Sequence, residues 1–361
     1  MNICFMLGGF SGNGGIGRVT SMLAGQLAEL DGYHVTTLSY VDAGLPNLYP
    51  VSERIEQRFL LNSYQSMAKL LLTGGERNLR KFLRENKIDV LVACGALFFP
   101  ICVRACKRTK VKCVCWEHTN PATEYDYRFQ GFARSYGAKR AHCNVVLTKR
   151  AKRFYESHFP KNKIAQIYNP IDTQVFKHAG SYRPESKKII SVGRLCYPKY
   201  FQMAIEVAGK VLPKCPEWCW DIYGEGEDRQ QLEQLIKEKG LSQQMHLMGQ
   251  VDDLYDRYQQ YAMMVMTSRY EGFPMSLLEG MGNGLPLISF DIDTGPDEII
   301  RDGENGYLIQ AFEKETMIER IEQLMADIPL REQLSQNGKA GCREFSQEKV
   351  LQQWRELLES L

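Results

Sequence analysis

Two glutamates, Glu271 and Glu279, enclose the segment of this chain whose residue types are best suited to chemistry. The sequence EGFPMSLLEGM predicts a loop that leads into a helix, and Pro274 suits the first helical turn. N–H groups at a helix start have no helical partner and lie at the positive end of the helix dipole. Here they belong to Phe273, Met275 and Ser276. The segment therefore predicts a seat for a phosphate or sugar oxygen, and Glu279 can accept hydrogen bonds from a vicinal diol.

The glycine-rich sequence GNGGIG near the amino terminus is a second candidate for phosphate or sugar binding. It precedes an amphipathic segment, so its exposed N–H groups can hold an anion, which Arg18 would reinforce. Gly12, Gly14 and Gly17 also satisfy the G-x-G-x-x-G pattern of dinucleotide-binding proteins. Four residues precede the first glycine where a tight turn is expected, and Asp42 lies past the second strand. These departures disfavour NAD binding, and an NAD-dependent oxidoreductase is kept as the alternative function.

The basic residues concentrate in the first half of the chain. Residues 1–180 hold 25 Lys and Arg against 13 Asp and Glu, whereas residues 181–361 hold 20 against 30. Basic residues mix with aromatic residues and leucines in ERNLRKFLRENK, KRTKVK, AKRAH and TKRAKRFY. Such segments suit an anionic membrane surface or a lipid-diphosphate acceptor, and solvated helix faces without a partner are the alternative. No nucleic acid partner is expected, because no recognition motif is present and the acidic half would be repelled.

The composition is that of a soluble globular protein with more than one domain. The 361 residues are 44% hydrophobic and 24% charged, and no stretch approaches the ~20 uncharged apolar residues of a membrane span. The amino terminus predicts a first buried strand rather than a signal peptide. The eleven cysteines show no paired C-x2-C and no histidine at ligand spacing. They predict buried, reduced thiols of a cytosolic protein and no metal site.

Apolar strand-like runs alternate with amphipathic helical segments twice along the chain, which predicts two doubly wound α/β domains. The predicted strands of the first domain are residues 2–7, 34–40, 88–95, 112–118 and 142–148. Those of the second are residues 188–194, 219–226, 245–251, 261–268 and 286–291. The expected division is a first domain of residues 1–176, a linker of residues 177–187 and a second domain of residues 188–344. The last helix, within residues 345–361, is expected to pack back onto the first domain.

Together these motifs resemble the fourth family of retaining glycosyltransferases, whose GT-B fold has two Rossmann-like domains that face each other across a cleft. EGFPMSLLEGM is similar to the E-x7-E element of the family, and SVGRLCYPK supplies Arg194 and Lys199 where the family has two cations. IYGEGEDRQQLE, HLMGQV and DTGPDEIIRDGENGYLI resemble its glycine–acid–glycine turn, its strand beside the nucleobase and its loop closing the donor site. WEHTNP resembles the segment of its strand-end histidine, here His118, and IYNPID the start of its second domain.

The resemblance implies a role for each matching residue. Arg194 and Lys199 would neutralise the donor diphosphate without a metal ion, Glu271 would hold hydroxyls of the donor sugar, and His118 would contact that sugar near the reacting carbon. The implied catalytic residues are His118, Arg194, Lys199 and Glu271. The implied donor-binding residues are Gly14, Gly15, Arg194, Lys199, Gly272, Phe273, Met275, Ser276 and Glu279, the last on the ribose diol. No metal and no separate cofactor are expected.

The resemblance also implies the reaction. A UDP-hexose or UDP-N-acetylhexosamine binds the second domain, and an acceptor saccharide, on a lipid diphosphate, binds the first. The acceptor hydroxyl attacks from the face that the diphosphate leaves, through an oxocarbenium-like state and without a protein nucleophile. The implied setting is bacterial surface polysaccharide or glycan synthesis, by a cytoplasmic protein peripheral on the inner face of the membrane. A sugar phosphorylase or epimerase of the same fold is a further alternative.

Two departures from the family pattern affect the expected local structure. The family commonly has glycine after the lysine, whereas this chain has Tyr200, so the loop is expected to differ there. The helix after Glu271 carries Gly280, Gly282 and Gly284, which are expected to loosen its end.

Overall fold

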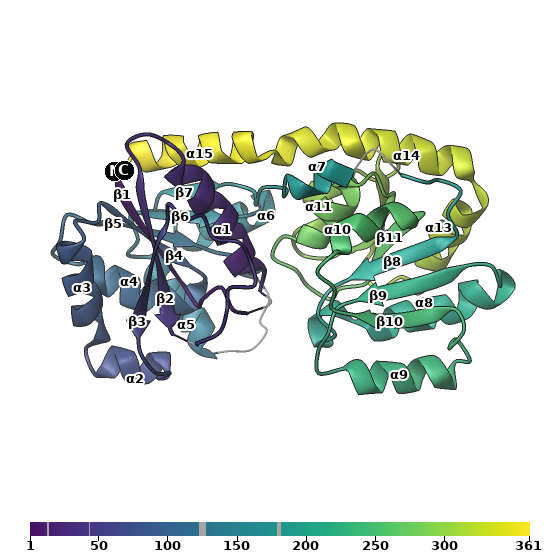
Figure 1. Cartoon of the computed structure of the whole chain (residues 1–361), viewed down its shortest axis with the longest axis horizontal. Coiled ribbons are helices and arrows are strands. Elements are labelled where there is room, and N and C mark those ends of the chain that lie inside the picture. Colours follow the sequence, from purple (N-terminus) through teal and green to yellow (C-terminus); the bar gives the residue numbers. More distant parts are fainter. Residues whose placement is uncertain (13, 43, 123–127, 179–181) are drawn as a thin grey trace. The chain divides into compact units, whose positions relative to one another are not determined.

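The computed structural model describes the chain apart from residues 13, 43, 123–127 and 179–181. It divides into two compact units: unit 1 comprises residues 1–170 and 348–361, and unit 2 comprises residues 171–347 (Figure 1). Each unit contains one sheet whose strands are all parallel. The prediction of two parallel-sheet α/β domains is confirmed.

The division between the units falls after Pro170, whereas the sequence places a linker at residues 177–187. Residues 179–181 of that segment lie outside the described residues. The part that follows is bonded to unit 2, because Tyr182 Oη donates to the carbonyl of Ala262 at 2.8 Å and Ser186 Oγ to that of Gln260 at 2.6 Å. Residues 182–186 are therefore attached along the edge of unit 2.

The sheet of unit 1 has the strand order β3-β2-β1-β4-β5-β6-β7. Its central strands are buried on both faces, as the apolar runs predict, and every residue of β4 is buried. The order reverses between β1 and β4, and the carboxyl ends of strands at such a point are where ligands bind in open α/β sheets. The strands are β1 (Asn2–Leu7), β2 (His34–Val41), β3 (Glu56–Leu61), β4 (Val90–Cys94), β5 (Lys112–Trp116), β6 (Cys143–Val146) and β7 (Ile164–Gln166).

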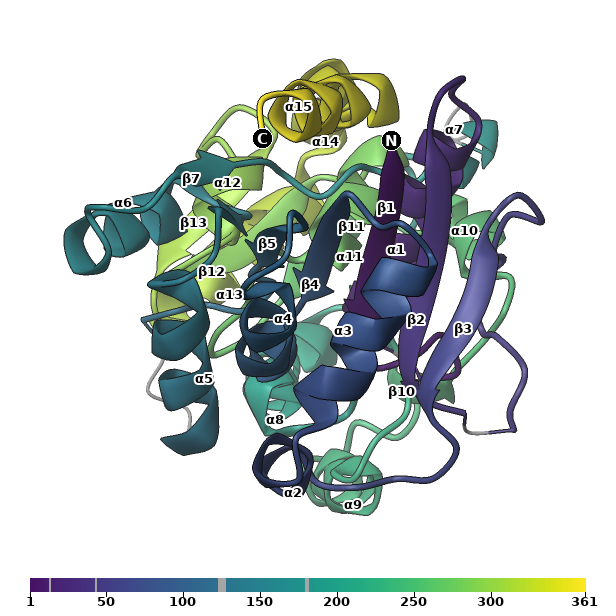
Figure 2. The ribbon, with the colours of Figure 1, turned by 90° about the vertical axis from the view of Figure 1, so that its left-hand side faces the viewer.

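Helices cover both faces of this sheet, and Figure 2 shows α3, α4 and α5 together on one of them. The core between that face and the strands includes Leu79, Leu83, Phe99 and a group of buried cysteines. The helices of unit 1 are α1 (Gly15–Ala28), α2 (Met67–Leu72), α3 (Gly75–Glu85), α4 (Phe99–Cys106), α5 (Arg128–Ala138), α6 (Lys149–His158) and α15 (Gln347–Glu359), with a 3-10 turn η1 (Ala96–Phe98).

The last helix, α15, packs on unit 1 through aromatic and polar contacts. The Trp116 and Trp354 rings meet edge to face with their centres 4.8 Å apart. Lys163 Nζ donates to Ser360 Oγ at 2.7 Å, and Tyr33 Oη donates to Glu359 Oε1 at 2.9 Å. The amphipathic end of the chain thus buries its apolar side, including Trp354, against unit 1.

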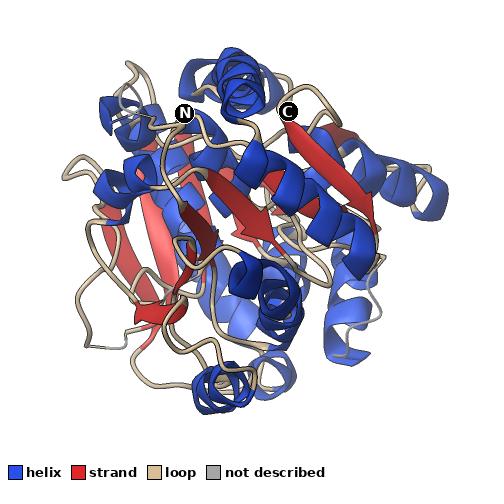
Figure 3. Ribbon diagram, turned by 90° about the vertical axis from the view of Figure 1, so that its right-hand side faces the viewer, coloured by secondary structure: helices blue, strands red, loops and turns tan. Residues whose placement is uncertain are grey.

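The sheet of unit 2 has the order β10-β9-β8-β11-β12-β13, which reverses between β8 and β11. Figure 3 shows helices on both sides of its strands. The core on one side is formed by α8, α9 and α13 with residues such as Trp220, Phe290 and Met317. The strands are β8 (Lys188–Val192), β9 (Cys219–Tyr223), β10 (Met245–Gly249), β11 (Met263–Met266), β12 (Leu287–Asp291) and β13 (Gly306–Gln310).

The helices of unit 2 connect the strands of its sheet and follow them towards the end of the chain. They are α7 (Gln174–His178), α8 (Phe201–Val211), α9 (Arg229–Glu238), α10 (Leu254–Arg257), α11 (Met275–Gly282), α12 (Pro296–Ile299), α13 (Lys314–Ala326) and α14 (Ile328–Gly341). The 3-10 turns are η2 (Tyr197–Lys199), η3 (Leu212–Lys214), η4 (Tyr258–Gln260) and η5 (Cys342–Phe345).

The glycines of α11 serve close packing rather than a loose helix end, which corrects the sequence expectation. A Cβ at Gly280 would lie 2.8 Å from Met264 Sδ, and one at Gly282 would lie 2.5 Å from Val175 Cγ1. A Cβ at Gly284, which follows the helix with φ +79°, would lie 2.3 Å from Lys339 Cε. All three positions therefore let α11 sit directly against its neighbours.

The remaining sequence expectations concern thiols and membrane spans. All eleven cysteines are free and most are buried, as predicted, and burial raises the pKa of Cys94 to about 12. Over the described residues, no helix combines the length and the apolar character that crossing a bilayer requires.

Candidate functional site

The amino end of α11 follows β11, at the edge of the unit 2 sheet where the carboxyl ends of the strands meet. Pro274 immediately precedes the helix with φ −75° and ψ 99°, and its carbonyl accepts a hydrogen bond from Leu277 N at 3.1 Å. Pro274 is therefore the residue before the helix, whereas the sequence placed it in the first helical turn. The N–H groups of Met275 and Ser276 have no helical acceptor, which leaves them available to an anion.

A second loop packs onto this helix start. Thr294 Oγ1 donates to the carbonyl oxygen of Glu271. Gly295 has φ +104°, and a Cβ there would lie 2.5 Å from Pro274 Cδ. Only glycine fits this conformation and this approach, so the TGP sequence holds Glu271 and Pro274 in place. The Phe273 side chain points into the core, where its ring lies 5.8 Å from that of Phe345.

Glu271 and Lys199, predicted from separate motifs, form an ion pair. Lys199 Nζ donates to Glu271 Oε1 at 2.6 Å, and Ser268 Oγ donates to the same oxygen at 2.7 Å. Both charged side chains are largely buried, with exposed fractions of 22% for Lys199 and 12% for Glu271. Lys199, Ser268 and Ser276, together with mostly apolar residues, line a hollow that is too narrow to hold a water molecule. A cation, a carboxylate and free amide groups thus converge at one edge of the sheet.

Glu279 lies on α11 and is buried, with 4% of its surface exposed. Tyr258, in η4, is fully buried and donates its hydroxyl to Glu279 Oε2 at 2.7 Å. This bond fixes the orientation of the carboxylate. A buried carboxylate held in this way can accept hydrogen bonds from a diol without reorganisation.

Arg194 is exposed at the carboxyl end of β8, and glycines bring its loop against the end of β9. Gly193 N donates to the carbonyl of Tyr223 at 2.9 Å and Leu195 N to that of Glu225 at 3.0 Å. A Cβ at Gly224 would lie 2.0 Å from Gly193 O, and a Cβ at Gly226 would lie 2.1 Å from Leu195 O. The glycine–acid–glycine sequence is therefore required for this backbone contact.

Lys199 ends the short η2 turn, and Tyr200 follows it in the left-handed conformation with φ 52° and ψ 45°. This conformation explains why glycine suits the position, since L side chains are disfavoured there. The sequence predicted a different loop because Tyr200 stands where the family commonly has glycine. In the structure, Tyr200 adopts the left-handed conformation that glycine favours. The aliphatic stem of Lys199 lies against Gly193, where a Cβ would be 3.1 Å from Lys199 Cδ.

In unit 1, His118 follows β5 and is buried, with 9% of its surface exposed. Its ring centre lies 4.3 Å from that of Trp116. Its Nε2 is buried and has no hydrogen-bond partner within the described residues. Burial lowers the pKa of His118 to about 4, although the neighbouring charge of Glu117 opposes the change. His118 is therefore a neutral imidazole at neutral pH.

Glu117, beside His118, is the centre of a buried polar network that the sequence reasoning missed. Its Oε2 accepts from Arg134 Nε at 2.6 Å and from Tyr155 Oη at 3.0 Å. Its Oε1 accepts from Thr119 Oγ1 at 2.7 Å and Thr119 N at 3.1 Å. Burial works against ionisation, yet the charge and hydrogen bonds of Arg134, with those of Thr119, hold the pKa of Glu117 below its usual value. The network ties the loop of His118 to α5 and α6.

Gly14 and Gly15 form the start of α1, after β1. Gly14 precedes the helix with φ −97° and ψ 138°, and Gly15 is its first residue. A Cβ at either position would meet no atom within 4 Å. The backbone is therefore open to a ligand here, as a phosphate-binding loop requires. Residue 13 of the GNGGIG motif lies outside the described residues.

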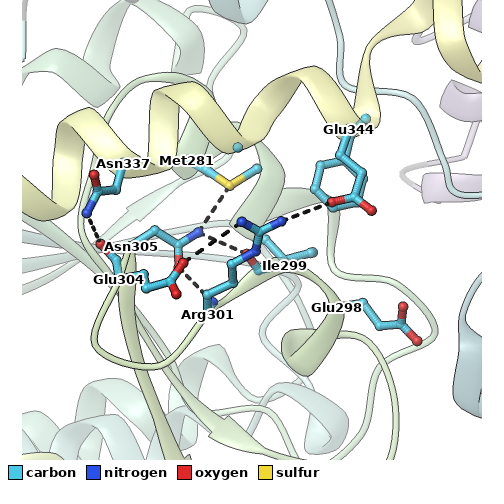
Figure 4. Close-up of a pocket in the computed structure, with 10 residues that line it drawn as sticks. Met281, Glu298, Ile299, Arg301, Glu304, Asn305, Asn337 and Glu344 are labelled. Atoms are coloured by element: carbon cyan, nitrogen blue, oxygen red, sulfur yellow. Dashed lines mark hydrogen bonds and ion pairs between the residues drawn. The ribbon is translucent and has the colours of Figure 1, made fainter.

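The cavity drawn in Figure 4 does not coincide with these residues. It lies between α11, α12, the loop of residues 301–305, α14 and η5, and its volume is about 30 Å³, which suits one or two water molecules and not a sugar. Figure 4 shows Arg301 between Glu304 and Glu344, at 3.9 Å and 3.5 Å. In the described part of the chain, no three His, Cys, Asp or Glu residues are placed to hold a metal ion.

The sequence reasoning also missed Ser268 and Tyr258 beside the two glutamates. Ser268 lies three residues before Glu271, with which the recognised segment begins, and its hydroxyl donates to that carboxylate. Tyr258 lies in a separate element, and nothing in its local sequence indicates a partner on α11. Of the predicted residues, unit 2 brings together Lys199, Glu271 and Ser276, while His118, Gly14 and Gly15 belong to unit 1.

Comparison with known families now defines the class of protein. The family model described as Glycosyl transferases group 1 matches residues 173–341, and that described as Glycosyltransferase Family 4 matches residues 13–175. The chain therefore belongs to the GT4-type glycosyltransferases. The comparisons give no support to the oxidoreductase alternative.

Individual relatives cover the whole chain. An uncharacterised glycosyltransferase of Haemophilus influenzae is 26% identical over 99% of both chains. The amylovoran biosynthesis glycosyltransferase AmsD of Erwinia amylovora is 27% identical, again over 99% of both chains. A mutant of TarM from S. aureus, solved with fondaparinux, alpha-GlcNAc-glycerol and UDP, has a TM-score of 0.82 at 16% identity over 99% of both chains. The fold of the two domains is thus the GT-B fold.

Proposed function

We propose that this glycosyltransferase transfers a hexose or N-acetylhexosamine from a UDP-sugar, with retention, to a saccharide acceptor in bacterial surface glycan synthesis. The observation that carries the proposal is the Lys199–Glu271 pair, which lies beside Ser276 at the helix start of α11. This set of groups lies at the point where the strand order of unit 2 reverses, and it offers both a cation for phosphate and a carboxylate for sugar hydroxyls.

Each donor group has a chemical match in unit 2. Arg194 and Lys199 bind the diphosphate, supplying two positive charges where other enzymes use a metal ion, and the N–H groups of Met275 and Ser276 add hydrogen bonds. Glu279, held by Tyr258, accepts from the two ribose hydroxyls. Glu271 accepts from hydroxyls of the donor sugar once Lys199 turns from it to the diphosphate.

His118, Gly14 and Gly15 act from unit 1. A neutral His118 does not repel the positive charge that develops on the donor sugar. Its Nε2, which has no hydrogen-bond partner among the described residues, can hydrogen-bond a sugar hydroxyl near the reacting carbon. Gly14 and Gly15 offer open backbone to the phosphate and the acceptor.

In the proposed reaction, the bond between the sugar carbon and the diphosphate breaks, and its electron pair leaves with the diphosphate. The acceptor hydroxyl forms the new bond on the same face and passes its proton to a diphosphate oxygen. Glu271 and Glu279 hold hydroxyls and form no covalent intermediate. Catalysis then consists of positioning and charge stabilisation, which preorganised cations supply.

The donor and the acceptor are inferred from relatives. TarM was solved with UDP and alpha-GlcNAc-glycerol, which supports a UDP-linked donor, and AmsD is named as an amylovoran biosynthesis glycosyltransferase, which supports a glycan acceptor. We assign the acceptor as a saccharide on a lipid diphosphate because unit 1 carries the basic segments of the chain.

The same basic surface would bring the protein to the inner face of an anionic membrane. On α3, Arg77, Lys81 and Arg84 are exposed at a spacing that places them on one face. Leu72, the last residue of the neighbouring α2, is 87% exposed. Basic residues beside an exposed leucine are typical of peripheral attachment to anionic lipid.

Vesicle sedimentation tests this attachment. Vesicles with anionic lipid should retain the protein and neutral vesicles should not, and replacing Arg77, Lys81 and Arg84 together by alanine should weaken retention. The matched control replaces three exposed lysines of unit 2, which are Lys214, Lys237 and Lys239. Equal sedimentation with both kinds of vesicle would remove the membrane proposal.

A thermal-shift screen of nucleotide sugars, followed by turnover assays, tests the function. A true donor stabilises the protein by mass action, by about 2.7 kcal/mol at a hundred times its Kd. Lys199→Ala should lower turnover at least ~100-fold while the protein stays folded. The control is Lys214→Ala, an exposed lysine paired with Glu322 at 2.6 Å. Unchanged turnover in Lys199→Ala would refute the site, and donor turnover without an acceptor sugar would favour an epimerase.

A further inference from the structure

Arg269 lies between the strand β11 and the predicted donor residue Glu271, and no motif explains it. Its guanidinium donates no hydrogen bond within the described residues, and its Nε is buried without a partner. Its Cζ instead lies 3.4 Å from the centre of the Tyr200 ring and 4.6 Å from that of the Tyr197 ring. A partly buried guanidinium in this position is held by stacking on aromatic faces and not by a carboxylate.

The two tyrosines flank Lys199 in the sequence, and the residues after β11 hold the turn between them at several points. Arg269 N donates to the carbonyl of Pro198 at 2.8 Å. Thr267 Oγ1 donates to the carbonyl of Tyr200 at 3.1 Å and approaches that of Lys199 at 3.3 Å. The backbone of the lysine turn is therefore fastened to the segment that also carries Glu271.

Tyr200 needs such support because of its conformation. With φ 52° and ψ 45° it occupies the left-handed region, which disfavours a tyrosine against glycine by a factor on the order of 5 to 30. The Arg269 guanidinium stacks on the Tyr200 ring, and the Phe312 ring meets the Tyr200 ring edge to face, with the two ring centres 6.1 Å apart. The side chain thus recovers, by stacking, what its backbone conformation loses.

We propose that Arg269 is a positioning residue for Lys199, and that the Arg269–Tyr200 stack replaces the glycine that relatives commonly have after this lysine. The stack selects the left-handed conformation of Tyr200, and this conformation directs the Lys199 side chain over Gly193 toward Glu271. Without Arg269, Tyr200 relaxes to an ordinary conformation and Lys199 leaves its place. The role of Lys199 on the diphosphate belongs to the proposed function, on which this inference rests.

The proposal predicts that the two substitutions are not additive. Arg269→Ala should weaken UDP binding by roughly 5- to 30-fold, the factor by which the left-handed conformation is disfavoured. Tyr200→Gly alone should leave UDP binding within about 3-fold of the wild type, because glycine adopts the turn without strain. In the double variant, Tyr200→Gly should restore most of the affinity that Arg269→Ala removes.

Isothermal titration calorimetry measures the UDP affinity of each variant, and initial-rate kinetics measure its turnover. Thermal unfolding checks that each variant is folded. Arg320, whose Cζ lies 4.5 Å from the Tyr307 ring centre, stacks on a tyrosine elsewhere in unit 2, so Arg320→Ala is the matched control and should leave UDP binding unchanged. If Arg269→Ala does not fold, Arg269→Lys takes its place, because lysine keeps the charge but loses the planar stack. Arg269→Lys must then weaken UDP binding, and Tyr200→Gly must restore it.

The outcomes separate this inference from the proposed function. If Lys199→Ala weakens UDP binding while Arg269→Ala does not, the positioning role is wrong and the site stands. If Arg269→Ala weakens binding and Tyr200→Gly fails to restore it, the stack does not act through the turn. If Lys199→Ala leaves UDP binding and turnover unchanged, the proposed function itself fails.

Discussion

Replacing His118 by glutamine tests whether a neutral imidazole is buried in unit 1. The folded protein holds the pKa of His118 at about 4, against an ordinary value of 6.5, chiefly because burial disfavours the charged ring. Between these two values the unfolded chain binds a proton that the folded chain does not. Stability must therefore fall as the pH falls from 6.5 toward 4.

The size of the effect follows from the two pKa values. A separation of about 2.5 pH units, at about 1.4 kcal/mol each, corresponds to roughly 3 kcal/mol of free energy of unfolding. Glutamine is of similar size and does not titrate. The difference in stability between wild type and His118→Gln should thus be constant above pH 7 and shift by roughly 3 kcal/mol in favour of the variant on going to pH 4.

Hydrogen exchange of peptides from β4 and β5 measures the stability of unit 1 alone in the wild type and in His118→Gln. The exchange rates are first corrected for the intrinsic pH dependence of exchange. His34→Gln, at an exposed position at the start of β2, controls for the loss of an imidazole. A difference between wild type and His118→Gln that stays constant from pH 7 to pH 4.5 would refute the reasoning. So would a difference that shifts in favour of the wild type.

Three further predictions concern unit 2. Tyr258→Phe should weaken UDP binding about tenfold in calorimetry, because it removes a hydrogen bond to a buried carboxylate, and Tyr33→Phe in unit 1 should not. Gly226→Ala should also weaken UDP binding, because its Cβ would collide with Leu195 O and displace the Arg194 loop, whereas Gly209→Ala, inside α8, should keep binding and raise the unfolding temperature. Arg331→Met should cost about 2–4 kcal/mol in urea unfolding, because the buried guanidinium donates to the carbonyls of Pro184, Leu324 and Met325; a loss below 1 kcal/mol would contradict this.

The alternating pattern of the sequence was sufficient for the two parallel sheets. Runs such as IDVLVACG and PLISFD are mostly apolar, and they became the buried strands β4 and β12. The edge strands β7 and β3 were not predicted. The sequence EQRFLL of β3 begins with three polar residues, and its burial pattern lacks an apolar face. Its position depends on pairing with β2, which local sequence does not encode.

The candidate site could be predicted only where its residues are close in sequence. The loop of Glu271 and the start of α11 are local features, and their positions were right within one residue. The pairs Lys199–Glu271, Tyr258–Glu279 and Arg134–Glu117 join different elements. They depend on how helices and strands pack, and a single sequence with many acids and bases offers too many combinations to select them.

Because Glu271 is paired with Lys199, its carboxylate competes for the lysine with the anion that the lysine is proposed to bind. Tethered at contact distance, it acts at a high effective concentration, so a small free anion gains little by displacing it. A nucleotide sugar brings phosphate oxygens for the lysine and hydroxyls for the glutamate, and so satisfies both partners at once. After transfer the sugar is gone, and the freed carboxylate can reclaim the lysine. The Lys199–Glu271 contact would then favour binding of the intact donor and promote release of the nucleoside diphosphate after transfer.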